Sequence, residues 1–553
     1  MSIRAGMLLC AATLVAVPHG AAAQIRNSAS PPAAQRQPLR LDPAIFAAIA
    51  QLWEVIGRSD NPVWPGWDAS DTPVLVYFPG EQEILLNHPA PPEGYVRADG
   101  LLPIVRPPGE RVWVRNGETH FPYDGQNTRT DIGGVSTLVV ADTLSNLRGW
   151  LRNQMNAPGS PADRGDLLTL EALSADPYRT MGLAGHEAFH VFQHARAPDK
   201  EITEAALLEY PVLSVDNNLG VALEAQALAA ALRAQDEGEI LRAARAALAI
   251  RLWRRAGLPQ SAIAYEDGIE FTEGLAKYVE YALTEALEGR TPIAEMRWVR
   301  GFVGFADMSV QRERLIKALL DVTDGTLVVN NDPYGAAPVR FRLYSSGMAI
   351  GALLDRLDTP GWKRRIMEPG VTLTGLLAER LGDFDRDAAL KAAMASDDAL
   401  LQRERVTRLA EAGRAANAAL LASILEADPA TPSWRLVIDY SALGDADPAF
   451  GYTPFGTTTL APGRVIYRMV PVSGRIPGGG DFQQLHPAPM LHDSHDSTIT
   501  FRVEGAVPDI APRPAGTLDG VALPGVTLDL LRGSVSVEGD TVVIRLLPAS
   551  PAE

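Results

Sequence analysis

The sequence predicts an α+β protein: a small N-terminal mixed sheet, then a mainly helical core, then a C-terminal antiparallel β-domain. Short extended runs separated by Pro and Gly occupy about residues 70–142. Apolar residues then recur with helical spacing over about 177–427. Short alternating runs with Gly and Pro between them return over 428–553. The length of 553 residues suggests about two to four domains or subdomains.

Residues 1–23 have the pattern of a secretory signal peptide. The apolar run "MLLCAATLVAV" follows a positive charge, and Ala21 and Ala23 supply the small residues that signal peptidase reads. We therefore expect export, to the periplasm or the medium. Cys10 is the only cysteine and lies in this segment. Any metal in the mature chain must then be bound by His, Asp or Glu.

The elements after this segment are predicted in order. Residues 24–40 are rich in Pro, Gln and Ser and form a flexible lead-in. A helix covers 41–57, with Asp42 placed to cap it and Pro43 at its first position. The sheet takes strands from 72–78, 110–117 and 135–142, and the core has helices at 221–234, 239–257, 264–287, 345–357 and 400–427. About six strands follow, at 435–440, 463–470, 497–503, 526–531, 534–539 and 541–547.

The charge balance limits the partners. The formal net charge is -17, and removal of the segment that holds Arg4 makes it -17 - 1 = -18. Such acidity argues against a nucleic-acid or anionic-membrane partner. No stretch after residue 23 is apolar enough to span a bilayer, so we expect no transmembrane segment in the mature chain. Composition does not indicate an oligomeric state.

The stretch "GHEAFHVFQH" carries the strongest chemical signal. His186 and His190 are four residues apart, so a helix would place them on one face with about 6 Å between their β-carbons. That separation suits two ligands of one tetrahedral ion. Glu187 is offset from that face and can reach a water at the metal, where it would act as general base. The alternative is a buried helix whose histidines only bond carbonyl oxygens.

A catalytic zinc site of this kind needs a third protein ligand. His194 would lie about 12 Å along the helix from His186, too far to share the ion, so we expect it to pack or to bond elsewhere. Glu273 is the best candidate, because Gly274 and Ala276 would let another helix approach closely. The other candidates are Glu224 and Glu270, for which ordinary polar positions are the more common interpretation.

The two motifs "HEAFH" and "TEGLAKY" are similar to those of gluzincin zinc metallopeptidases of the peptidase MA clan, including exported bacterial members. The resemblance implies a zincin-like catalytic region over 41–427 and a peptide or protein substrate. It implies zinc bound by His186, His190 and Glu273, with Glu187 as the base. Lys277 replaces the aspartate of the thermolysin-like pattern. The partner that orients the first histidine is therefore open among Glu270, Glu280 and Glu224.

Acyl transfer also needs a donor for the developing oxyanion. In "RFRLYSSGMAIGALLDRL", Tyr344 stands just before the predicted helix start, with Ser345 and Ser346 as caps. We favour Tyr344 as this donor; Arg340 and Arg342 are cationic candidates. The competing interpretation is a tyrosine that only packs at the helix entrance. Tyr278, in the glutamate motif, is expected in the core.

Two further runs of charged residues and histidines are not assigned a ligand or a metal. The basic run "RLWRRAG" ends a predicted helix, where cations complement the dipole, and is assigned no partner. The segment "LHPAPMLHDSHDST" holds His486, His492, Asp493, His495 and Asp496, which are predicted to face water in a loop rather than to form a second metal site.

Two functions from different classes remain. The first is an exported zinc hydrolase that cuts peptide bonds. The second is a non-catalytic binding or scaffold protein that retains a peptidase-like helical core. The intact set of His186, Glu187, His190 and Glu273 favours the hydrolase.

Overall fold

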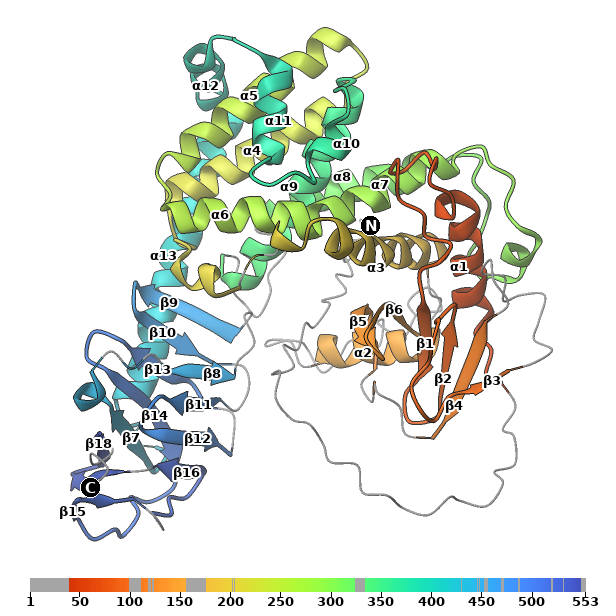
Figure 1. The fold of residues 1–553 in the computed structure, drawn as a ribbon. Coiled ribbons are helices and arrows are strands. Elements are labelled where there is room, and N and C mark those ends of the chain that lie inside the picture. Colours follow the sequence, from red (N-terminus) through yellow and green to blue (C-terminus); the bar gives the residue numbers. More distant parts are fainter. Residues whose placement is uncertain are drawn as a thin grey trace.

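The protein is described here by a computed structural model. It describes residues 39–98, 111–117, 121, 124–155, 176–200, 202, 204–323, 334–428, 430–444, 446, 448–451, 456–468, 472–485, 488–518, 521–530 and 532–548. The predicted signal peptide at 1–23 and nearly all of the lead-in lie outside these ranges. The chain is α+β, as predicted, with a helical region between two regions of sheet (Figure 1).

Helix α1, Pro43–Ile56, begins as the sequence predicts. The side chain of Asp42 accepts hydrogen bonds from the backbone N–H groups of Ala44 and Ile45, at 3.0 and 3.3 Å. These groups have no partner within the helix, so the cap stabilises its first turn. The helix packs against α3, Pro177–Arg196.

The N-terminal sheet is mixed and has the order β3-β4-β2-β1-β6-β5. Strands β1 and β6 are parallel, and the other neighbours are antiparallel. The sequence identified three of its strands and missed β2, β3 and β5; β5 is a polar, partly buried edge strand with little alternation. The strands are β1 Val74–Phe78, β2 Gln82–Leu86, β3 Val96–Arg97, β4 Val112–Asn116, β5 Thr128–Ile132 and β6 Val135–Ala141.

Helices dominate the middle of the chain, as predicted. Helix α3 lies between the N-terminal sheet and α7, and it packs against both (Figure 1). The helices are α2 Thr143–Met155, α3 Pro177–Arg196, α4 Val215–Arg233, α5 Glu237–Arg255, α6 Gln260–Ile269, α7 Leu275–Leu287, α8 Ser309–Thr323, α9 Ala336–Arg356, α10 Trp362–Arg365, α11 Leu373–Leu381, α12 Arg386–Met394 and α13 Asp397–Leu425. Shorter helical turns are η2 Pro198–Lys200, η3 Glu204–Glu209 and η5 Ala294–Trp298.

The predicted helix over 264–287 forms, but its geometry changes at the candidate glutamate, Glu273. Helices α6 and α7 are joined without a break by η4, Glu270–Gly274, which has π-helical geometry. A π turn inserts an extra residue into the helix, shifts the side chains that follow it around the axis, and is frequent at functional sites. The sequence carried no signal for this turn, because Glu, Phe and Thr are common in ordinary helices.

The C-terminal region forms two facing sheets with more strands than the six predicted. One has the order β15-β17-β18-β7-β14-β13-β10-β9 and the other β16-β12-β11-β8. All neighbours are antiparallel except β7 and β18. The added strands are short: β8 Ala449–Gly451, β9 Thr457–Ala461, β11 Ser473–Ile476, β12 Gly480–Gln484, β13 Met490–Asp493 and β15 Arg513–Thr517. The six expected strands are β7 Ser433–Asp439, β10 Arg464–Tyr467, β14 Thr498–Glu504, β16 Val526–Leu530, β17 Arg532–Glu538 and β18 Thr541–Leu546.

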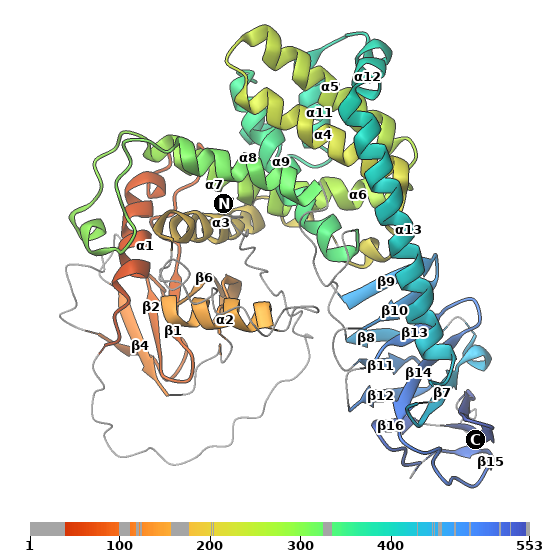
Figure 2. The ribbon, with the colours of Figure 1, turned by 180° about the vertical axis from the view of Figure 1, so that it is seen from behind.

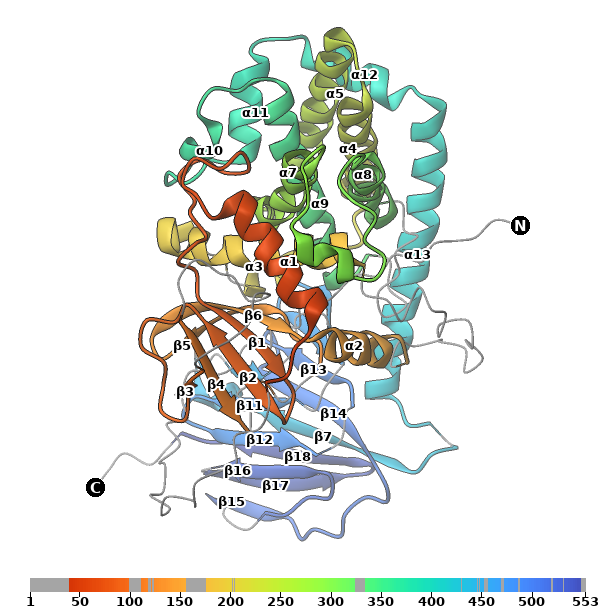
Figure 3. The same ribbon diagram turned by 90° about the vertical axis from the view of Figure 1, so that its right-hand side faces the viewer.

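Helix α13 connects the helical and C-terminal regions. It starts beside α4 and runs down to the sheet (Figures 2 and 3). Near its end Ile424 is buried with Ile466 and Leu491 of the sheet. The sandwich otherwise has a core of its own, which is separate from the main core around α3, α7 and α9. None of the described helices is long and apolar enough to cross a membrane.

Candidate metal centre

The two histidines of the motif lie on one face of α3, as predicted. Asp176 caps this helix by accepting from the N–H groups of Tyr178 and Arg179, and Pro177 takes its first position. The rings of His186 and His190 have centroids 4.9 Å apart. His186 is 5 % exposed, because α7 covers this part of α3.

The η4 turn brings Glu273 to these histidines. Its Oε2 atom lies 3.3 Å from Nε2 of His186 and 3.4 Å from Nε2 of His190. Two donors that each lie about 2.1 Å from a tetrahedral zinc ion are about 3.4 Å apart, so both distances fit a shared ion. Among the described residues, these three form the one group of His, Cys, Asp or Glu side chains that could hold a metal ion.

A close helix contact sets the position of η4. A β-carbon on Gly274 would lie 2.7 Å from the Cα atom of Gly347 in α9, and one on Gly347 would lie 2.8 Å from the carbonyl oxygen of Glu270. The two backbones therefore touch where neither residue has a side chain. The prediction that Gly274 permits a close approach is confirmed.

Each histidine is oriented through its second ring nitrogen. Nδ1 of His186 lies 2.9 Å from Oε1 of Glu280, and Nδ1 of His190 lies 3.0 Å from Oε1 of Gln193. If each Nδ1 carries the proton, both Nε2 lone pairs face Glu273. Metal-binding histidines typically have such partners. Of the three orienters left open by the sequence, the structure selects Glu280; it also adds Gln193, three residues after His190, whose amide donates to the carbonyl of Phe271 at 2.7 Å.

The electrostatics of the site favour a cation. Burial opposes protonation of His186, but the carboxylates of Glu273 and Glu280 outweigh it and raise the pKa of His186 to about 10. Burial likewise opposes ionisation of Glu280, yet Lys277 and His186 lower its pKa to about 2. The imidazole thus lies between two anionic groups in a dry site, where a positive charge is stabilised.

Glu187 is a further buried ionisable residue close to these charged side chains. It is 4 % exposed, and burial raises the pKa of its carboxyl despite the neighbouring histidines. A carboxylate with a raised pKa binds a proton more readily near neutral pH, as a general base requires.

Tyr344 lies beside the histidines, but its helix differs from the prediction. Its ring centroid is 6.2 Å from that of His186. Helix α9 begins at Ala336, so Tyr344 is in mid-helix rather than before the helix start, and the predicted serine caps are wrong. Pro338 is tolerated in the first turn of α9, where its missing N–H costs no hydrogen bond. Ser346 does not cap the helix but donates a hydrogen bond to Glu270 at 2.5 Å. Burial raises the pKa of the Tyr344 hydroxyl well above its usual value, so it stays protonated.

Of the two arginine candidates, only Arg340 reaches the site. It donates to Oε1 of Glu273 at 3.1 Å and to the hydroxyl of Tyr344. Arg342 points away and donates to Asn218 and Tyr210. Tyr278 is in the core, as predicted, with its hydroxyl on Asp355.

Glu224 and Glu270, the other ligand candidates, belong to a buried ion cluster beside the site. Arg251 donates to both oxygens of Glu270 at 2.6 and 2.7 Å and to Glu224 at 2.8 Å. The run "RLWRRAG" lies at the end of α5, as predicted, and its three arginines are buried in ion pairs, which the sequence did not predict. We call this group the ion cluster: Glu224, Arg251, Arg254, Arg255, Glu266, Asp267 and Glu270.

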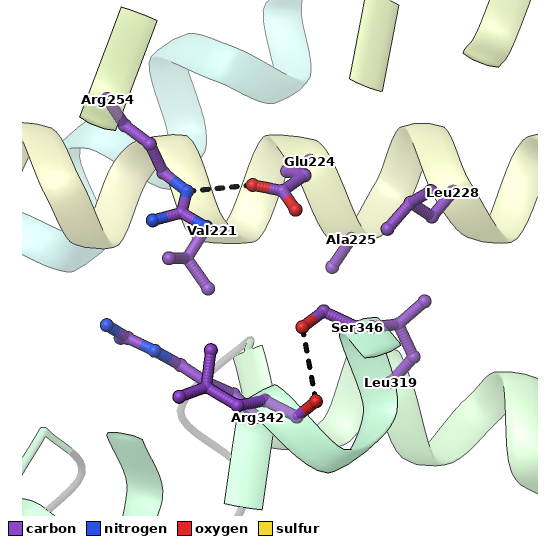
Figure 4. A pocket seen from close by; sticks show the side chains of 9 residues that line it. Val221, Glu224, Ala225, Leu228, Arg254, Leu319, Arg342 and Ser346 are labelled. Atoms are coloured by element: carbon purple, nitrogen blue, oxygen red, sulfur yellow. Dashed lines mark hydrogen bonds and ion pairs between the residues drawn. The ribbon is translucent and has the colours of Figure 1, made fainter. Parts of the chain in front are cut away.

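A small internal pocket adjoins the ion cluster. Glu224 and Arg254 form one wall, with Nε of Arg254 donating to the carboxylate at 2.7 Å, and Arg342 and Ser346 of α9 face them (Figure 4). Neither His186 nor His190 lines it. The pocket therefore belongs to the packing between α4 and α9 rather than to the metal centre.

The remaining histidine predictions have mixed outcomes. His194 is half-buried and lies outside the candidate metal group, as expected. In the C-terminal region His486 lies outside the described residues. His492 and Asp493 are buried on β13, where they pair with Tyr440 and Arg464, so the prediction of a water-facing loop is wrong for them. His495 bonds the carbonyl of Pro462 at 2.9 Å.

Comparison with protein-family models, with curated proteins and with solved structures found no match to this chain.

Proposed function

We propose that this protein is an exported zinc metallopeptidase of the gluzincin type, with a zincin-like core. The observation that carries the proposal is the convergence of three donor atoms, from His186, His190 and Glu273, with a bonded partner on each outer imidazole nitrogen. Two imidazoles and one carboxylate are the ligand set of many catalytic zinc sites, in which a fourth position stays open. Export is proposed from the apolar pattern of residues 1–23.

A zinc ion in such a site supplies Lewis acidity, which polarises a scissile carbonyl and lowers the pKa of a coordinated water. Glu187 would accept a proton from the attacking water and deliver it to the leaving amine; its buried position suits this exchange. Tyr344 would donate a hydrogen bond from its hydroxyl to the oxyanion that develops on the substrate. Glu280 and Gln193 would hold the imidazoles in orientation.

The substrate that we propose is a peptide or protein, and the net charge of -17 argues against nucleic acid. The test is metal analysis of the purified protein, followed by digestion of a peptide library. Wild type and Glu187→Gln should each hold one zinc per chain, while turnover falls by about 10²- to 10⁴-fold in the variant. His186→Ala should lose both the metal and the activity.

His194→Ala is the matched control, since this histidine is on the same helix but outside the candidate group. It should retain both zinc and turnover. A wild-type protein that holds no metal would refute the proposal. Zinc with no cleavage by wild type or by Glu187→Gln would instead support a non-catalytic scaffold that retains a peptidase-like core, and equal cleavage by both would show that Glu187 is not the general base.

A further inference from the structure

We infer that Arg340 is a positioning residue of the metal centre, which holds one carboxylate oxygen of Glu273 so that only the other faces the imidazoles. The inference rests on the proposed function and assigns to this arginine a role that the two motifs do not contain. It is carried by a chain of contacts from Glu204 through Arg340 to Glu273.

The two oxygens of Glu273 have different partners. Oε2 lies 3.3 and 3.4 Å from the Nε2 atoms of His186 and His190. Oε1 accepts a hydrogen bond from Nη2 of Arg340 at 3.1 Å. A carboxylate can bind a metal through one oxygen or through both. The guanidinium occupies one of these oxygens and therefore favours binding through Oε2 alone.

Arg340 is itself held rigidly. Only 4 % of its side chain is exposed, and three groups contact its guanidinium: Glu204, Glu273 and the hydroxyl of Tyr344. Nε donates to Oε1 of Glu204 at 2.8 Å. The other oxygen of Glu204 accepts from the hydroxyl of Tyr265 at 2.9 Å. A planar guanidinium with several fixed partners loses little freedom on forming each bond and sets a defined direction.

The charge of Glu204 explains how a cation can stand beside a metal ligand. An isolated guanidinium at this position would repel a divalent ion in a buried site, where Coulomb interactions are strong. Glu204 carries the opposite charge at hydrogen-bond distance from Arg340. The pair is neutral overall, so Arg340 can orient Glu273 without adding a net positive charge beside the ion. One-oxygen binding also leaves the fourth position of a tetrahedral ion open, as hydrolysis requires.

The test separates orientation from charge by comparing three variants of the full chain. Arg340→Met/Glu204→Gln removes the pair while preserving the local net charge, and it leaves Glu273 with His186 and His190 as partners. Glu204→Gln alone leaves the positive charge uncompensated. Arg340→Lys keeps the charge but loses the planar fork. The measurements are zinc affinity by chelator competition, the visible absorption of the cobalt(II) form, and thermal unfolding without metal.

The double variant should unfold near the wild-type temperature and lose about 10- to 100-fold in zinc affinity. Its cobalt spectrum should weaken toward that of a five-coordinate ion, as Glu273 becomes free to bind through both oxygens. Glu204→Gln should also bind zinc less tightly but keep the wild-type spectrum, and Arg340→Lys should be intermediate. Wild-type affinity and spectrum in the double variant would overturn the inference. A wild-type protein that binds neither metal would instead refute the proposed function on which it rests.

Discussion

Oε2 of Glu273 lies 3.3 Å from Nε2 of His186, although the two residues are 87 positions apart in the sequence. The contact forms because α3 and α7 pack side by side and a π turn rotates Glu273 into the space between them. Substitutions at the residues that support this contact should therefore change zinc affinity or stability.

Glu280 orients the first histidine, so Glu280→Gln should weaken metal binding by about 10- to 100-fold. The amide retains the hydrogen bond at Nδ1 of His186 but loses the charge that makes this imidazole a better donor. The measurement is zinc affinity by competition with a chelator. Glu285→Gln, at an exposed position of the same helix, is the control. Equal zinc affinities of the two variants would show that Glu280 does not support metal binding.

Gly347→Ala should displace the η4 turn. Its new β-carbon would meet backbone atoms of Glu270 and Gly274 at 2.7–2.8 Å, and backbone cannot move aside as a side chain can. We expect a loss of about 1–3 kcal/mol of unfolding free energy, together with weaker zinc binding. Gly375→Ala is the control, because a β-carbon there would meet only a hydroxyl of Thr372, at 3.3 Å. Urea unfolding should find the control as stable as wild type or more so.

Glu266→Gln should be strongly destabilising, because it leaves Arg254 and Arg255 with an uncompensated buried charge. Glu266 is fully buried and accepts from these arginines at 2.6 and 2.8 Å. Removal of one partner from a buried ion pair costs about 3–5 kcal/mol. Glu379→Gln breaks an exposed pair with Arg365 and serves as the control. Chemical denaturation that finds similar losses for both variants would contradict the assigned importance of the ion cluster.

The ion cluster should also make stability depend on pH. Burial alone would raise the pKa values of Glu266 and Glu224, but the adjacent arginines outweigh it and lower both below the usual 4.5. A carboxyl with a lowered folded-state pKa stabilises the fold fully above its unfolded pKa. That contribution is lost as the pH falls through the folded value.

The difference in unfolding free energy between wild type and Glu266→Gln should therefore be constant from pH 7 to about 5 and shrink below about 4.5. Denaturation curves collected at several pH values measure this difference. A gap that stays the same down to pH 3 would show that folding does not lower the pKa of Glu266.

The sequence by itself determined the local geometry of the site. Helical periodicity places residues four apart on one face, so His186 and His190 could be paired and Glu187 offset without any knowledge of the fold. The cap at Asp42, the position of the helical region and most of the longer strands followed from equally local rules. A π turn at Glu270 and a helix start at Ala336 were missed, because the residues involved are common in ordinary helices.

Only the tertiary structure decided which distant groups meet. It brought Glu273, which the sequence already favoured over Glu224 and Glu270, to the two histidines, selected Glu280 as the partner of His186, and placed Arg340 between Glu204 and Glu273. It also buried the arginines of "RLWRRAG", which in sequence look like an ordinary basic helix end. A helix reveals which of its faces is polar but not which polar face it will meet. That choice depends on how helices from separate parts of the chain pack.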